Sequence, residues 1–186
     1  MTSVVISLLR GVNIGGHHKI GMDALKALYE SLDLGNVRTW GQSGNVLFTT
    51  SGRNLGRIAQ RIEDGIERQS GFRSNVILRT TSELREVIRR NPFATRPGID
   101  PSHLIVTFLA SDPGQDARDK VLAIHLDPEE LVFGAREHYI HFPNGVGRSK
   151  LPTAAIERAL GTPGTGRNWN SVTKMLELAE QMEALG

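Results

Sequence analysis

The first 80 residues alternate between short apolar runs and longer stretches with apolar residues at helical spacing. The run Val4–Arg10 is rich in β-branched residues and apolar on both faces, so it predicts a central β-strand. Two further runs flank Ser43-Gly44, a pair typical of a hairpin turn. The predicted strands are Val4–Arg10, Val37–Gln42, Asn45–Thr50 and Asn75–Arg79, and the two predicted helices carry apolar faces of Leu25, Leu28, Tyr29 and Leu32 and of Leu55, Ile58, Ile62 and Ile66.

The resulting order, βαββαβ, is that of a ferredoxin-like unit. A third helix is predicted at Ser82–Arg90, and Asn91-Pro92 ends it. The segment Asn91–Ser102 holds three prolines and a glycine, so we expect a linker there. The pattern then restarts, with predicted strands at His103–Ala110, Glu130–Phe133 and Tyr139–Phe142 and predicted helices at Ala117–Leu126, Pro152–Leu160 and Ser171–Leu185.

This order predicts an α/β (α+β) fold of two ferredoxin-like βαββαβ-type halves, with mainly antiparallel sheets and helices packed on one face. We expect residues 1–80 to form the first half, 81–102 a helix and linker, and 103–186 a second βαββα half plus a C-terminal helix. The repeated element order indicates a duplication with little residue identity. The last helix is expected to pack through one apolar face, made of Val172, Met175, Leu176, Ala179, Met182 and Leu185.

Composition is that of an ordinary folded chain. Apolar residues make up 39% and charged residues 23%, which excludes disorder of the whole chain. The absence of cysteine excludes disulfide scaffolds, iron–sulfur clusters, thiolate zinc sites and cysteine nucleophiles. No apolar run approaches the roughly 18 residues of a membrane span, and Val4–Leu9 lacks the flanks of a signal peptide. We therefore expect a cytoplasmic protein with no membrane contact.

The net charge of +2 does not by itself indicate a nucleic-acid partner. Of the 22 basic residues 17 are arginine, which suits bidentate recognition of phosphate or carboxylate. A genome-wide codon bias toward arginine explains the same count, so the charge alone does not decide between these interpretations.

The first polar segment is the glycine-rich loop Arg10–Lys19, between a strand and a helix. Such a loop can direct backbone N–H groups at an anion. Gly11 and Gly16 have the spacing of P-loop glycines, but His17 stands where the P-loop lysine belongs, so no nucleotide triphosphatase is expected. Two interpretations remain, a looser anion cradle and a mobile connection that needs glycine for its turns. The cradle would use Arg10, Asn13, Gly15, Gly16 and Lys19.

The second polar segment, Gly41–Asn45, resembles a nucleophile elbow only superficially. Its second glycine comes one residue early and strands flank it, so Ser43 is expected to be a turn residue. Gln42, Ser43 and Asn45 are candidate ligand contacts. In a ferredoxin-like unit the first two strands run parallel, so both segments should meet at one sheet edge. The start of the fourth strand, around Arg73 and Ser74, should reach that edge too. Convergence of the two segments would form a concave polar site.

The third polar region comprises Gly147–Leu151 and Gly164–Asn170. It carries three cations, Arg148, Lys150 and Arg167, in predicted loops without neighbouring acids, so we expect them to bind anions. Asn170 is a plausible N-cap for the last helix. Trp169 fits a hydrophobic staple or a stacking platform for a planar ligand, and Asn168, Trp169 and Arg167 are expected to close over the first site.

No residue stands out for catalysis or metal binding. His17 and His18 are adjacent, so both rings rarely reach one metal, and no acid lies at ligand spacing; their role stays unassigned. His138 and His141 are three apart on a predicted strand and should point to opposite faces. No carboxylate pair forms an acid/base couple. The sequence therefore predicts no catalytic residue, metal or cofactor.

Three segments together carry a family resemblance: LLRGVNIGGHHKI, VRTWGQSGNVLF and TGRNWNSVTKML. The chain resembles the bacterial family called domain of unknown function 1697 over essentially its whole length. The resemblance implies an α/β fold of ferredoxin-like halves. That family has no established activity, so the resemblance supplies no reaction, cofactor or catalytic residue. Members often carry a basic or polar residue where this chain has His17 and His18.

The favoured function is binding of a small anionic or nucleotide-like ligand in the glycine-rich loops. A nucleic-acid-binding module is an alternative, but sheet recognition of RNA needs aromatic residues on central strands. The first strand has none, the third has Phe48, and Trp40 lies on the second. The sequence is also compatible with an enzyme of unknown reaction and with a protein-interaction module that has no small ligand. Nothing in the sequence indicates an oligomeric state.

Overall fold

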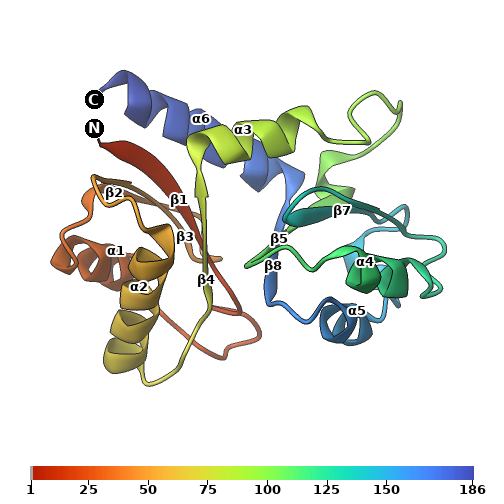
Figure 1. Ribbon diagram of the computed structural model, residues 1–186, viewed down its shortest axis with the longest axis horizontal. Coiled ribbons are helices and arrows are strands. Elements are labelled where there is room, and N and C mark those ends of the chain that lie inside the picture. The colour runs from red at the N-terminus through yellow and green to blue at the C-terminus, as the bar shows by residue number, and fades with distance from the viewer. Residues whose placement is uncertain (1) are drawn as a thin grey trace. The chain divides into compact units, whose positions relative to one another are not determined.

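A computed structural model describes residues 2–186 (Figure 1). These residues contain six α-helices and two four-stranded antiparallel sheets, which confirms the mixed α/β class. The chain divides into two compact units: the first runs to Leu84 and takes in Met175–Gly186, and the second is Arg85–Lys174. The chain passes from one unit to the other within helices α3 (Thr81–Arg89) and α6 (Trp169–Ala184).

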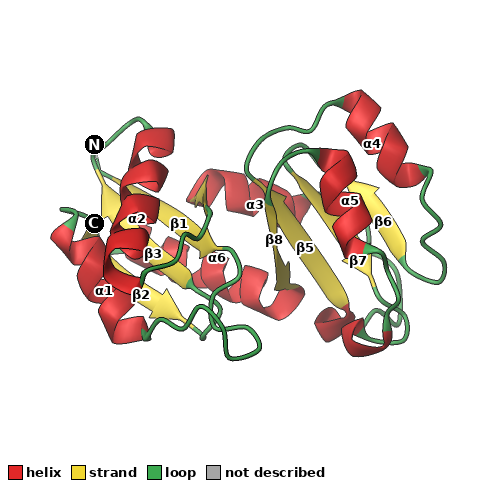
Figure 2. Ribbon diagram, turned by 90° about the horizontal axis from the view of Figure 1, so that it is seen from below, coloured by secondary structure: helices red, strands yellow, loops and turns green. Residues whose placement is uncertain are grey.

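The first unit has the predicted βαββαβ order, with its strands arranged β2-β3-β1-β4. Figure 2 shows α1 and α2 together on one face of this sheet. Strand β1 lies between β3 and β4, and both of its faces are buried, which confirms the central strand. The elements are β1 (Ser3–Leu9), α1 (Met22–Ser31), β2 (Gly35–Trp40), β3 (Asn45–Thr50), α2 (Leu55–Ser70) and β4 (Val76–Thr80).

The core of the first unit lies between the sheet and α1 and α2. Helix α2 presents Ile62 and Ile66 to this core, and Asn54 caps its start by accepting the Arg57 N–H at 3.0 Å. Tyr29 of α1 is completely buried, and its hydroxyl lies 2.7 Å from that of Ser7 on β1. Burial raises the pKa of Tyr29, so the phenol stays neutral and acts as a hydrogen-bonding group within the core.

The second unit repeats the same order, with its strands arranged β6-β7-β5-β8. Helices α4 and α5 lie on one face of its sheet (Figure 2). The segment Asn91–Ser102 contains no helix or strand before a short 3-10 turn at Pro101–His103. The elements are β5 (Leu104–Leu109), α4 (Gln115–Leu122), β6 (Glu130–Phe133), β7 (Glu137–His141), α5 (Thr153–Leu160) and β8 (Gly164–Asn168).

Strand β8 corrects the prediction that the second half is βαββα. The segment Gly164–Asn168, expected to be a loop, pairs antiparallel with β5 along the sheet edge. Its sequence, GTGRN, is poor in β-branched and aromatic residues, so local preference does not reveal a strand. The pairing with β5 supplies the ladder that the residues themselves do not predict. The second half is therefore a complete βαββαβ unit.

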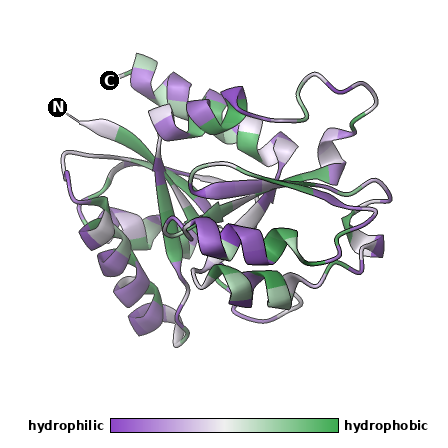
Figure 3. Cartoon of the chain, turned by 45° about the vertical axis from the view of Figure 1, so that its right-hand side comes forward, coloured by the Kyte–Doolittle hydropathy of each residue, from purple (hydrophilic) through white to green (hydrophobic). Residues whose placement is uncertain are grey.

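Helix α6 is amphipathic, and Figure 3 shows polar and apolar residues alternating along it. The predicted apolar face is confirmed in part. Leu176 is half-buried, and Leu185 is 79% exposed, so the face ends before Leu185. The helix begins at Trp169, and the Asn168 side chain caps it by accepting the Ser171 N–H at 2.9 Å. The N-cap prediction for Asn170 was therefore wrong by two residues. The buried face consists of Val172, Met175, Ala179 and Met182.

Candidate functional site

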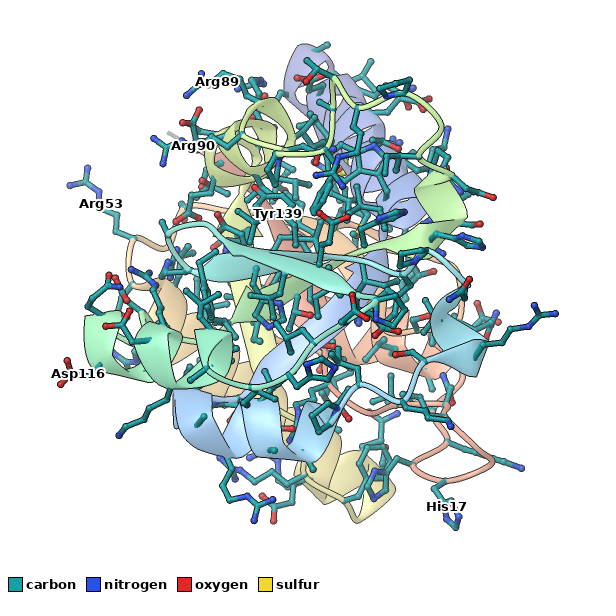
Figure 4. The ribbon with its side chains drawn as sticks, turned by 90° about the vertical axis from the view of Figure 1, so that its right-hand side faces the viewer. His17, Arg53, Arg89, Arg90, Asp116 and Tyr139 are labelled. Atoms are coloured by element: carbon teal, nitrogen blue, oxygen red, sulfur yellow. The ribbon has the colours of Figure 1, made fainter. Side chains whose placement is uncertain are left out.

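The Arg10–Lys19 loop folds into a small hairpin. The His17 N–H donates to the Ile14 carbonyl at 3.0 Å across Gly15 and Gly16. These glycines have φ of +57° and +80°, the left-handed backbone that a two-residue hairpin turn of this kind requires. The tip is exposed, and Figure 4 shows the His17 side chain pointing away from the ribbon. Glycine at the tip is therefore accounted for by the turn.

Asn13 joins the two polar segments of the first unit. Its side-chain amide donates to the Ile20 carbonyl at 3.0 Å and to the Gln42 carbonyl at 2.9 Å. Its Oδ1 accepts the Ile20 N–H at 2.9 Å. Both amide hydrogens are engaged inside the protein, so in this conformation Asn13 organises the loop. Its backbone has φ of +55°, a conformation that asparagine tolerates better than most residues.

The predicted meeting of the two segments at one sheet edge is confirmed. The Leu9 N–H donates to the Gly44 carbonyl at 2.9 Å, and the Ser74 hydroxyl donates to the Arg10 carbonyl at 2.8 Å. A Cβ atom at Gly44 would lie 2.6 Å from Val12 and also clash with Leu9, so the turn packs tightly against the loop. The topology predicted from the strand order is therefore correct.

The polar groups at this junction mostly hold the loops together. Asn45 is 2% exposed, and its amide donates to the Trp40 carbonyl at 3.0 Å. His18 stacks on Phe72 with ring centroids 4.6 Å apart. Arg10 is half-buried, whereas Gly15, Gly16, Lys19, Gln42 and Ser43 are exposed. Ligand binding at this junction stays a prediction.

Arg167 corrects the description of the third region. It lies on β8 rather than in a loop and is 7% exposed. Its Nη1 donates to Thr165 Oγ1 at 2.7 Å and to the Gly166 carbonyl at 2.9 Å. Burial lowers the pKa of Arg167 to about 10, so the guanidinium remains charged at neutral pH. Because Asn168 caps α6 and Trp169 is half-buried in its first turn, these residues have structural roles; a ligand role for them stays a prediction.

Arg148 and Lys150 are exposed cations on the chain between β7 and α5. Within residues 2–186 neither side chain forms an ion pair or a hydrogen bond. Both line a cavity of about 330 Å³, which contains charges of both signs. Its other polar side chains come from His125, Asp127, Glu129 and Asn144, and Leu126, Pro128, Leu151 and Pro152 complete it.

A second cavity, of about 120 Å³, lies between the second sheet and α5. Leu151 lines this cavity as well as the one beside Arg148. We call the smaller one the α5 cavity. It is lined by the hydroxyl-bearing Thr107, Thr153 and Thr162, by His138 and Glu157, by Gly164, and by Leu109, Ile140, Leu151, Ile156 and Leu160.

His138 is the least expected residue of the α5 cavity. It is 3% exposed, and its Nδ1 is buried without a hydrogen-bond partner among the described residues. Burial lowers the pKa of His138 to about 4, so the imidazole is neutral at pH 7. The sequence predicts a strand beside His138 but no site for it. The strand around it, EHYIH, is mostly polar, so its residues give no signal that His138 is buried in a cavity.

Two further properties concern residues 2–186 as a whole. No three His, Asp or Glu side chains within them gather in a way that would hold a metal ion. None of their helices is both long and apolar enough to cross a membrane. A cytoplasmic location stays a prediction from the sequence.

Comparison with known proteins agrees with the fold. Residues 1–139 match the sequence profile of a family described as "Protein of unknown function (DUF1697)". No curated protein matches the chain. A solved structure, that of the conserved bacterial protein SP0830 from Streptococcus pneumoniae, is similar with a TM-score of 0.73 at 20% sequence identity. The similarity covers 96% of this chain and 99% of that one, so the two share their fold throughout.

Proposed function

The chain belongs to the DUF1697 family of unknown function, and for this member we propose that the second unit binds a small anionic, nucleotide-like ligand through Arg148 and Lys150. The observation that carries the proposal is a pair of unpaired cations on a cavity-lining segment. Arginine and lysine are the usual protein partners of phosphate and carboxylate groups.

Several other arginines of the same unit contact neighbouring acids. Arg89 and Arg90 contact Glu86, and Arg96 contacts Glu130. The contacts with Glu86 lower the pKa of its exposed carboxyl group to about 2. Arg148 and Lys150 have no such partner within residues 2–186, so their positive charges are available to a ligand.

The remaining charges of the cavity narrow the ligand class. Asp127 and Glu129 line it together with the two cations. A bare anion would be repelled by these carboxylates, whereas a phosphate attached to a sugar also carries hydroxyl groups that can donate hydrogen bonds to them. A phosphorylated sugar or nucleotide therefore matches the cavity better than inorganic phosphate.

The test is calorimetric titration with ribose 5-phosphate. Removing both cations in an Arg148→Ala/Lys150→Ala variant should weaken binding at least about tenfold, because a hydrogen bond to a charged group contributes about 1.5–3 kcal/mol. Stability should change little, since both side chains are exposed and unpaired. Arg53→Ala is the matched control: Figure 4 shows Arg53 extended into solvent, and it too has no partner within residues 2–186. Equal affinities in all three proteins, or no binding to the unmodified chain, would refute the proposal.

The nucleic-acid alternative receives less support. Recognition of RNA on a sheet requires exposed aromatic rings on which bases stack. Phe48 is completely buried beneath the helices of the first unit, and Trp40 lies on the edge strand β2. Neither position provides a stacking platform on a central strand.

A further inference from the structure

The two units are repeats whose positions correspond through their backbone hydrogen bonds. Leu9 and Leu109 each end the first strand of a unit, and each donates its N–H to the residue before the third strand, at 2.9 and 2.8 Å. The next residues, Arg10 and Ala110, each donate their N–H to the carbonyl of the residue directly before the fourth strand, at 2.9 Å in both units. Ser7 therefore corresponds to Thr107.

The side chains around this position differ between the two units. Ser7 lies opposite Val46 and Leu78 on its neighbouring strands. Thr107 lies opposite His138 and Gly166. One pair further along the ladder, Leu9 faces Val76 and Leu109 faces Gly164. The second sheet thus carries two glycines where the first carries a valine and a leucine, and one of them, Gly164, lines the α5 cavity together with Thr107.

The helix that covers this part of the sheet is also shorter. Helix α2 has 16 residues, and the corresponding α5 has 8. The chain between β7 and α5 is correspondingly long and carries Arg148 and Lys150. In the first unit the Tyr29 side chain packs against Ser7, the counterpart of Thr107, and the two hydroxyls lie 2.7 Å apart in the buried core. In the second unit Thr107 lines the α5 cavity instead.

We propose that the α5 cavity binds a single uncharged six-membered ring with a polar edge, such as a pyrimidine base, belonging to the ligand whose phosphate Arg148 and Lys150 hold. This inference rests on the proposed function and adds the ligand's second half. The volume of about 120 Å³ suits one ring, since an engineered protein cavity of about 150 Å³ holds benzene. A purine, with two fused rings, is too large for it.

The chemistry of the lining fits a pyrimidine. Leucine and isoleucine side chains offer apolar contacts to the faces of a flat ring. The hydroxyls of Thr107 and Thr153 can each donate or accept at its edge, and so can the neutral imidazole of His138. The Thr162 hydroxyl already accepts hydrogen bonds from the Ser111 N–H and hydroxyl, at 3.2 and 2.9 Å. A buried ring nitrogen without a partner is uncommon in a folded protein, and here it belongs to a residue of this cavity.

The two cavities adjoin along the chain. Leu151 lines both, Lys150 lies on one side of it, and Thr153 opens α5 on the other. A nucleotide with its base in the α5 cavity would therefore have its phosphate next to the segment that carries the two cations.

The experiment compares uridine 5′-monophosphate with ribose 5-phosphate, which lacks only the base. The unmodified chain should bind the nucleotide at least about tenfold more tightly. Thr153 is exposed at the cavity, so Thr153→Leu should fill the space, remove the nucleotide's advantage and leave ribose 5-phosphate binding unchanged. Ala154→Leu is the matched control, because Ala154 is the next exposed residue of α5 and does not line the cavity; it should preserve the advantage.

Equal affinity for the two compounds, or an advantage that survives Thr153→Leu, would overturn the inference. The proposed function would still stand if ribose 5-phosphate binding depends on Arg148 and Lys150. Loss of all binding to the unmodified chain refutes both. If Thr153→Leu does not fold, methyl NMR of the unmodified chain decides: the nucleotide, and not ribose 5-phosphate, should shift the signals of Thr107 and Ile140. Unshifted signals contradict the inference.

Discussion

His138 illustrates how the neighbours of a residue determine its chemistry. Its counterpart in the first unit, Val46, is a core residue packed beneath α1 and α2. His138 keeps that burial, and desolvation holds the imidazole neutral. From spacing alone, the same residue is only one of two histidines three positions apart, which does not indicate a site. Burial, visible only in the fold, makes it a candidate ligand contact.

The lowered pKa of His138 predicts a specific loss of stability in acid. The unfolded chain takes up a proton near the ordinary histidine pKa of ~6.5, whereas the folded chain does so near 4. Stability is therefore complete above ~6.5 and falls as the pH drops from there toward 4, by up to about 3 kcal/mol. Denaturant unfolding at several pH values measures this. The His138→Val variant introduces the side chain that the first unit has at Val46, so the loss of stability caused by His138 protonation should vanish. If the stability of the two proteins falls in parallel as the pH drops, the lowered pKa of His138 is contradicted.

Other candidate residues are accounted for by the backbone they support. Asn13, Asn45 and Asn168 are polar residues near glycines, as ligand contacts often are. In the structure their side chains bind backbone groups of a loop, a turn and a helix end. Sequence spacing cannot separate these roles, because both need the same short amide in the same irregular segments.

At the scale of elements, the sequence predicts best where apolar periodicity is strong. Strand β1 and helix α2 have clear patterns, and the structure confirms both. Strand β8 has no such pattern, and its pairing with β5 determines its conformation. The missed strand moved Arg167 from a predicted loop into a buried position. The error in one element therefore became an error in one site residue.

The start of α6 provides a direct test at this scale. Asn168→Ala removes the side-chain acceptor of the Ser171 N–H and should destabilise the chain by about 1 kcal/mol. Asn170→Ala, two residues later, should change the free energy of unfolding by less than about 0.5 kcal/mol, since its exposed side chain is inside the helix and makes no cap. Thermal or denaturant unfolding of the pair distinguishes them. A larger effect at Asn170 would restore the cap position expected from the sequence.

At the scale of the whole molecule, the strand order of the first unit and the meeting of its two polar segments could be predicted. Both follow from the βαββαβ order and from the pairing rules of antiparallel strands. The α5 cavity could not be predicted, because it depends on residues from three strands and a helix that are far apart in sequence. The short α5 and the glycines of β8 stand out only when they are compared with α2 and β4, the corresponding elements of the first unit.

The C-terminal helix should contribute strongly to the stability of the whole chain. Met175 is completely buried, and Met175→Ala should cost about 2–5 kcal/mol because it leaves a cavity. Leu185, directly after the same helix, is 79% exposed, so Leu185→Ala should cost less than about 0.5 kcal/mol. Chemical denaturation gives both values. Similar costs for the two variants would show that the helix does not bury the face described here.

Backbone NMR of the full chain during titration with ribose 5-phosphate tests the central claim most directly, because it locates binding without a mutation. If the second unit holds the anion, the largest shifts should fall in residues 125–129 and 144–152, the two segments that supply the lining of the cavity of Arg148 and Lys150. Shifts confined to Arg10–Lys19 and Gly41–Asn45 would place the site at the sheet edge of the first unit instead and contradict the account, and so would a spectrum that does not change at saturating ligand.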